Sequence, residues 1–199
     1  EPSGLPGERA GPVGEGVVLL SLAISPCAGA IGPRVPTSAP LRLEVRERGI
    51  VALVGRNGSG KSVLLAAAAG LVQLSQIEVA WLQRPSSAPL LAAQYPDHQL
   101  FQENVGEEVV YAAVSRGLDR ETARACAIRH FGSLGLDGLN LMRRRTWELS
   151  SGEKRMVQVV GTLIARTSLV LLDEPTCGLD AARRRAIAGI VIDRARSGP

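Results

Sequence analysis

GRNGSGKS, residues 55–62, fits the phosphate-binding pattern G-x-x-x-x-G-K-[ST] at every fixed position. The apolar run before it, Gly49 to Val54, predicts a short strand, and Val63 to Ala69 predicts an alanine-rich helix. Glycines let the chain between a strand and a helix curl so that its backbone N–H groups face a phosphate chain. In such a loop Lys61 reaches the β- and γ-phosphates of a nucleotide, and the Ser62 hydroxyl binds Mg²⁺. The octet therefore predicts a nucleotide-binding loop.

The length and charge of the chain limit its partners. Its 199 residues are enough for one sizeable core and a small subdomain. The net charge of +4 is scattered, and the two arginine runs, Arg143–Arg145 and Arg183–Arg185, are typical of solvated faces. Aromatic residues make up only 3% of the chain, which leaves little surface for stacking bases. We therefore expect no nucleic-acid partner.

Cysteine usage and hydropathy indicate the compartment. Cys27, Cys126 and Cys177 lie far apart and form no C-x-x-C pair, so neither a disulfide framework nor a cysteine metal site is expected. A reducing cytoplasm is the default for such a chain. The longest apolar runs have about ten residues, roughly half of what a membrane-spanning helix needs.

The chain divides by composition into a leading segment and a patterned remainder. Residues 1–40 hold seven of the twelve prolines and predict loop, with one short strand at Val17–Ile24. Alternating patterns and apolar runs predict strands at Leu41–Val45, Ile77–Leu82, Leu90–Gln94 and Ser168–Leu172, and helices at Val105–Arg116, Arg120–Leu134, Leu139–Glu148 and Ala181–Arg196. Strands that alternate with helices favour an α/β fold with a largely parallel sheet and helices on both faces. We assign 41–93 and 150–199 to the core of that fold and 94–149 to a small helical subdomain.

One more helix is predicted from a local signal. Ser150-Ser151-Gly152-Glu153 matches a capping box, in which a serine caps a helix and a glutamate three residues later reaches back to it. One apolar stripe follows at helical spacing: Met156, Val159, Val160, Leu163 and Ile164. The free N–H groups and positive dipole end of this helix would therefore lie at Ser150.

A second acidic element completes the expected site. A phosphate loop needs a carboxylate for Mg²⁺, normally at the end of a neighbouring buried strand. The apolar run Leu169–Leu172 ends in Asp173 and Glu174. Asp173 would hold the metal, and Glu174 would polarise the water that attacks the γ-phosphate.

Taken together, these motifs resemble the nucleotide-binding subunit of ATP-binding cassette (ABC) transporters over about residues 41–196. They follow the family's order: residues 55–62 match Walker A, Leu149–Glu153 resembles the LSGGQ signature, Leu169–Glu174 matches Walker B, and Gly178–Asp180 resembles the D-loop. A further segment, Gln94–Phe101, is similar to the Q-loop of energy-coupling-factor and cobalt/nickel importer ATPases, which read Q-x-P-D-x-Q-L-F.

The resemblance implies an ATPase that powers import of a vitamin or a metal ion from the cytoplasmic face of the membrane, with ATP and Mg²⁺ as cofactors. Its catalytic residues would be Glu174, Lys61 and Gln94, and its metal ligands Ser62, Gln94 and Asp173. The nucleotide would contact Gly55, Asn57, Gly58, Ser59, Gly60, Lys61, Ser62 and Val63. Ser150 and Gly152 would cap the γ-phosphate held by a second ATP-binding subunit, in a homodimer or a heterodimer. The Q-loop and the helical subdomain would contact an integral membrane subunit.

The chain also departs from the family pattern. No aromatic residue precedes Trp81 to stack on adenine, so either nucleotide affinity is weak or adenine rests on an apolar side chain near Pro26 and Cys27. Ser151 replaces the first glycine of the signature, and Glu153 replaces its glutamine. The switch histidine, expected about thirty residues after Glu174, is absent, which favours a truncated piece of a longer chain. Two alternatives stay open: a module that binds nucleotide with little or no hydrolysis, and a non-transport ABC ATPase.

Overall fold

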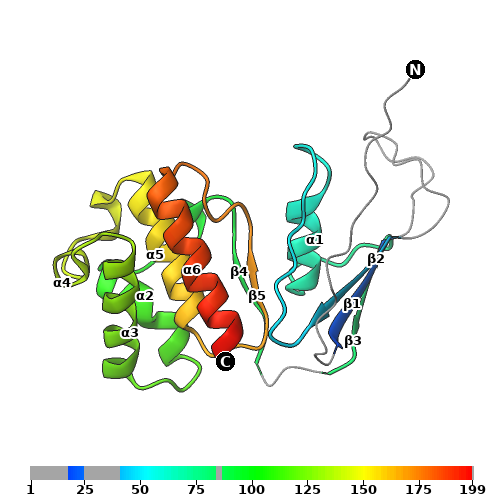
Figure 1. Ribbon diagram of the computed structural model, residues 1–199, viewed down its shortest axis with the longest axis horizontal. Coiled ribbons are helices and arrows are strands. Elements are labelled where there is room, and N and C mark those ends of the chain that lie inside the picture. The colour runs from blue at the N-terminus through cyan, green and yellow to red at the C-terminus, as the bar shows by residue number, and fades with distance from the viewer. Residues whose placement is uncertain (1–17, 25–40, 84–86, 199) are drawn as a thin grey trace.

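The computed structural model describes residues 18–24, 41–83 and 87–198 of the chain (Figure 1). The expected adenine contact near Pro26 and Cys27 lies outside this part. The strands are β1 (Val18–Ile24), β2 (Leu41–Arg46), β3 (Ile77–Trp81), β4 (Leu90–Ala92) and β5 (Val170–Leu172). The helices are α1 (Lys61–Ala68), α2 (Val105–Val114), α3 (Arg120–Ser133), α4 (Gly138–Leu141), α5 (Ser151–Ile164) and α6 (Ala181–Ser197), with 3₁₀ turns η1 (Pro96–His98) and η2 (Thr146–Glu148).

The strands form two separate sheets. β1 lies between β2 and β3 and pairs antiparallel with both, so that Leu22 lies opposite Leu43 and Val79. β4 and β5 form a parallel pair in which Leu91 lies opposite Leu171. These pairings confirm the strands predicted from alternating and apolar runs, and they give an α/β architecture with a parallel element beside the expected acidic residues.

One predicted strand is wrong. Gly49–Val54 forms no strand, and the side chains of Ile50 and Val51 are 55% and 41% exposed. A strand exists only where a neighbour accepts and donates its ladder hydrogen bonds. An apolar cavity of about 720 Å³ lies between this segment and β5, and its walls include Ile50–Leu53 on one side and Leu169–Leu172 on the other. Among the described residues no strand fills that gap, so the run stays unpaired.

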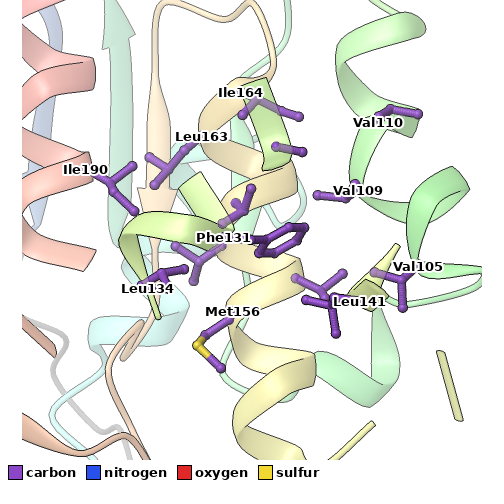
Figure 2. Packing of buried hydrophobic residues seen from close by; sticks show 14 of the residues in the cluster. Val105, Val109, Val110, Phe131, Leu134, Leu141, Met156, Leu163, Ile164 and Ile190 are labelled. Carbon is purple, nitrogen blue, oxygen red and sulfur yellow. The ribbon is translucent and has the colours of Figure 1, made fainter. Parts of the chain in front are cut away.

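The larger core is helical. Figure 2 shows Phe131 of α3 at its centre, with Met156 and Leu163 of α5 and Val109 of α2 around it. Phe131 and Val109 are fully buried and Met156 is 1% exposed. The apolar stripe predicted for α5 therefore faces α2 and α3, as its spacing indicates.

The helix predictions are confirmed with small shifts at their ends. α1 begins at Lys61 rather than Val63, and the run expected at Leu139–Glu148 is divided into α4 and η2. The capping box at Ser150 forms in both directions, and the Asp180 side chain caps α6 by accepting a hydrogen bond from the Arg183 N–H. None of the described helices combines the length and the apolar character that crossing a membrane requires.

Candidate nucleotide-binding site

The octet 55–62 forms an exposed turn that leads into α1. Gly58 and Gly60 adopt φ angles of +77° and +92°, a region that residues with a Cβ enter only at a cost. Gly60 is also the N-cap of α1, where no side chain accepts a hydrogen bond from the first turn. The N–H groups of that turn are therefore available to an anion.

The Lys61 ammonium folds back over this loop. Its Nζ donates hydrogen bonds to the backbone oxygens of Gly55 and Arg56, each at 3.0 Å. An ammonium has three protons, so one donor remains for a phosphate oxygen while the other two brace the loop. Gly55, Asn57, Ser59 and Ser62 are exposed around it, and Val63 is 46% exposed.

The acidic pair lies at the end of β5. Asp173 is 6% exposed, and its N–H donates to the Ala92 oxygen at 2.9 Å, which continues the β4–β5 ladder. No described residue donates a hydrogen bond to its carboxylate, so both oxygens are available to a cation. Glu174 follows with a φ of +47° and an exposed side chain. A left-handed conformation in a residue other than glycine costs of order 1–3 kcal/mol and is commonly found at functional sites.

The fold brings most of the predicted catalytic residues together. Lys61, Asp173 and Glu174 all line the cavity between β5 and the segment 50–53. Gln94, which follows β4, donates a hydrogen bond from Nε2 to Oε2 of Glu174 at 3.3 Å. Ser62 lies exposed on the first turn of α1 and does not line the cavity.

The donor set fits a bound Mg²⁺ that is shared with a phosphate. The described residues contain no group of three or more His, Cys, Asp or Glu side chains that could hold a metal. Mg²⁺ is commonly bound through one or two protein ligands, with substrate phosphates and waters completing its octahedron. The carboxylate of Asp173, which lines the cavity, is a ligand of the type Mg²⁺ prefers, and the Ser62 hydroxyl is a second oxygen ligand that lies outside the cavity lining on the first turn of α1.

Sequence reasoning missed a buried polar network beside Gln94. Arg155 of α5 is 5% exposed and donates to the backbone oxygens of Ala93 and Gln94, and Gln158 donates to the Ala93 oxygen and to Gln99. These bonds tie α5 to the loop that carries Gln94. The signal was available, because Arg155 and Gln158 are polar residues three apart next to the apolar stripe.

The N-terminus of α5 is separate from the cavity. Ser150 is exposed, and Gly152 packs close enough to Leu179 that a Cβ built at Gly152 would lie 3.5 Å from Leu179 Cδ2. Leu179, in the segment 178–180, therefore packs against the first turn of α5. Neither Ser150 nor Gly152 lines the cavity that holds Lys61 and Asp173.

Comparison with known proteins agrees with this arrangement. A profile of the ABC transporter family matches residues 39–177, which span the phosphate loop, the signature and the acidic pair. The chain belongs to the ABC transporter family. Its relatives include an ABC transporter ATP-binding protein of Gloeobacter violaceus, 34% identical over 152 residues, 72% of this chain and 62% of that protein. The energy-coupling factor transporter ATP-binding protein EcfA2 of Bacillus licheniformis is 33% identical over 156 residues, 72% of this chain and 54% of that protein.

The fold of this ABC family member is that of known ABC ATPases. The structure of cbiO1 from Clostridium perfringens, part of the ABC transporter complex cbiONQ, superimposes with a TM-score of 0.62 at 23% identity, covering 88% of this chain and 74% of that one. The P-loop ATPase fold expected from the resemblance is thereby confirmed. The chain spans less than two thirds of the length of the two curated relatives above.

Proposed function

We propose that this chain binds Mg·ATP and hydrolyses it as the ATPase subunit of an energy-coupling-factor-like importer of a vitamin or a metal ion. The observation that carries the proposal is the shared cavity, whose walls include Lys61 of the phosphate loop and the two carboxylates that follow β5, Asp173 and Glu174. Glu174 is oriented by Gln94 and is exposed, so a water can reach it. The names of the relatives support the transport role.

Each residue has a distinct task in this proposal. The third N–H of the Lys61 ammonium donates a hydrogen bond to the β- and γ-phosphate oxygens, while the other two hold the loop. Asp173, Ser62 and Gln94 would hold Mg²⁺, which supplies charge neutralisation for the phosphates when it is bound. Glu174 accepts a proton from the attacking water, and the Gln94 amide keeps its carboxylate in place.

Calorimetry and a turnover assay test the proposal. Lys61→Ala should abolish ATP binding, because Lys61, unlike Arg56 of the same loop, also lines the cavity shared with Asp173 and Glu174. Glu174→Gln should keep ATP bound and stop hydrolysis, because the amide keeps the shape and removes the base. Unchanged ATP affinity in Lys61→Ala would refute the site, and a parent that binds ATP without turnover in the complete complex would favour the binding-only alternative.

The membrane partner has its own support. Tyr95 and Phe101, in the segment after Gln94, are 60% and 63% exposed, and the Phe101 ring packs edge-on against Tyr111 at 4.8 Å. Exposed aromatic clusters are typical of protein interfaces. We propose that this aromatic cluster (Phe101 and Tyr111, with Tyr95 in the same segment as Phe101) contacts the integral membrane subunit. The chain would then be a peripheral protein on the cytoplasmic face of the membrane.

A matched pair of variants tests that contact. Phe101→Asp should prevent co-purification with the membrane subunit and leave ATP binding intact, whereas Leu71→Asp, at a residue 66% exposed outside the helical subdomain, should affect neither. Equal losses in the two variants would show that the cluster has no special role. Co-purification with a soluble partner in place of a membrane subunit would favour a non-transport ABC ATPase.

A further inference from the structure

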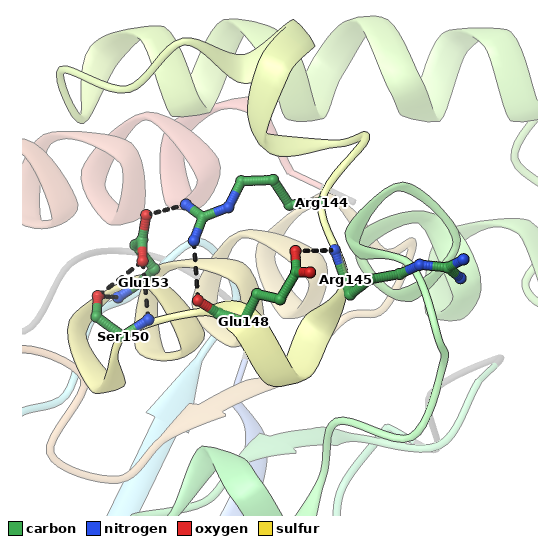
Figure 3. Close-up of polar contacts among 5 residues, drawn as sticks. All are labelled: Arg144, Arg145, Glu148, Ser150 and Glu153. Atoms are coloured by element: carbon green, nitrogen blue, oxygen red, sulfur yellow. Dashed lines mark hydrogen bonds and ion pairs between the residues drawn. The ribbon is translucent and has the colours of Figure 1, made fainter.

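The signature of this chain carries a negative charge where an anion is expected to bind. Glu153 stands at the first turn of α5, and its carboxylate faces the N-terminus of that helix (Figure 3). Its Oε2 accepts hydrogen bonds from both the N–H and the hydroxyl of Ser150, each at 2.8 Å. The hydroxyl proton of Ser150 is therefore directed at Glu153 and away from any incoming phosphate.

Arg144 donates a hydrogen bond to the other oxygen of this carboxylate, Oε1. Its Nη1 lies 2.5 Å from Glu153 Oε1, and its Nη2 donates to the backbone oxygen of Glu148 at 2.9 Å. The side chains of Arg144 and Glu153 are 34% and 22% exposed, so solvent screens the pair only in part. One guanidinium thus connects the turn η2, which precedes the signature, to the first turn of α5.

Resting on the proposed function, we infer that Arg144 is a positioning residue of the signature, which neutralises Glu153 so that Ser150 and the N-terminus of α5 can accept the γ-phosphate bound to a second subunit. It acts through Glu153 and does not itself touch the phosphate. Without it, an uncompensated carboxylate would repel the anion and hold the Ser150 hydroxyl more tightly. A glutamate can stand in the signature of this chain because an arginine five residues before the signature Leu149 compensates it.

The titration of Glu153 agrees with this geometry. Burial acts to raise the pKa of Glu153, but hydrogen bonds from Ser150 and the hydrogen bond and charge of Arg144 together hold it below its ordinary value. Lys154, the next residue on α5, forms its own ion pair with Asp97. Arg144 is thus the cation that pairs with Glu153, and its removal should raise the pKa of that carboxyl.

A charge-compensation cycle in the Glu174→Gln background tests the inference by ATP-dependent dimerisation, measured by sedimentation. Arg144→Met should weaken the dimer about tenfold, a change of about 1.4 kcal/mol. Glu153→Gln should keep or improve the parent affinity, and the double variant should recover it, because the charge to be neutralised is gone. Arg143→Met, an exposed neighbour with no described side-chain bond, is the matched control and should behave as the parent.

The pH profile separates compensation from a purely structural role. Acidification should partly restore the dimer of Arg144→Met, because protonated Glu153 carries no charge, and it should not do so in the double variant. A double variant as weak as Arg144→Met, without recovery at low pH, would overturn the inference and assign Arg144 to structure or to direct phosphate contact. A parent that binds ATP through Lys61 but never dimerises would also overturn it, and leave the proposed ATP binding intact. Failure of ATP binding itself would refute the proposed function.

Discussion

Helices α1 and α5 both begin at a segment that is expected to contact phosphate: α1 follows the phosphate loop, and α5 begins at the signature. Their N-termini are stabilised by different interactions. α5 begins at a reciprocal capping box and buries nine of its residues, among them Met156 and Val160. α1 begins at Gly60 without any side-chain cap and buries only Leu64, Ala67 and Ala68. The signature is therefore preorganised by its own chain, whereas the phosphate loop depends on Lys61 and, in the proposed function, on the nucleotide for much of its order.

The same contrast extends to the strands around the site. Asp173 follows a strand that is paired with β4, and its own N–H continues that pairing. The run Gly49–Val54, which leads into the phosphate loop, is paired with no described strand and borders the apolar cavity. We therefore expect side chains on the helical side to dominate the free energy of unfolding.

Phe131→Ala should give the largest decrease in the free energy of unfolding. Phe131 is fully buried at the centre of the helical core, and removing a buried phenyl group costs about 3–5 kcal/mol. Urea unfolding followed by circular dichroism measures the change. The matched control is Phe101→Ala, since Phe101 is 63% exposed and should cost no more than about 1.5 kcal/mol for its edge contact with Tyr111. An equal loss of unfolding free energy at the two sites would contradict the view that the helical core dominates stability.

Arg155→Met should cost about 1–3 kcal/mol, because methionine keeps much of the apolar stem and leaves the Gln94 oxygen and part of the Gln158 amide without a donor. The same urea titration detects it. Arg185→Met, at an exposed position of α6, should stay near zero. A cost at Arg155 no greater than at Arg185 would show that the network between α5 and the Gln94 loop adds no stability.

Ser150→Ala should cost about 1 kcal/mol, the usual value of a lost helix cap. Ser151→Ala is its neighbour control, because Ser151 is exposed and its side chain makes no described hydrogen bond. Thermal unfolding of both variants distinguishes them. If the two substitutions had the same effect, the capping box would not be what holds the start of α5.

Val51→Ala should have the smallest effect, below about 0.5 kcal/mol, because Val51 is 41% exposed and belongs to the unpaired run. Hydrogen exchange tests the same difference, because the backbone amides of residues 50–60 should exchange much faster than those of α5. A cost at Val51 above 1 kcal/mol would show that the run before the phosphate loop is paired in solution. The comparison of the two regions would then fail.

Most elements of the fold could be predicted from the sequence, and the failures have one cause. The apolar stripe of α5 and the alternation in β2 are local patterns, and both are confirmed. Gly49–Val54 has the composition of a strand, but a strand also needs a partner that composition does not show. Arg144 shows the same limit, because the sequence presents it only as part of a charged run and its partner, Glu153, lies nine residues further on.

The phosphate-loop octet, the capping box at Ser150 and the acidic end of β5 follow from local sequence, because turn chemistry, capping and hydrophobic period belong to contiguous residues. Three relations come from the packing of the chain: Lys61 and Asp173 line one cavity, Gln94 donates a hydrogen bond to Glu174, and Arg144 pairs with Glu153. These relations join segments up to 112 residues apart, Lys61 and Asp173 being the widest. Their geometry depends on how helices and strands pack, and no local pattern encodes that.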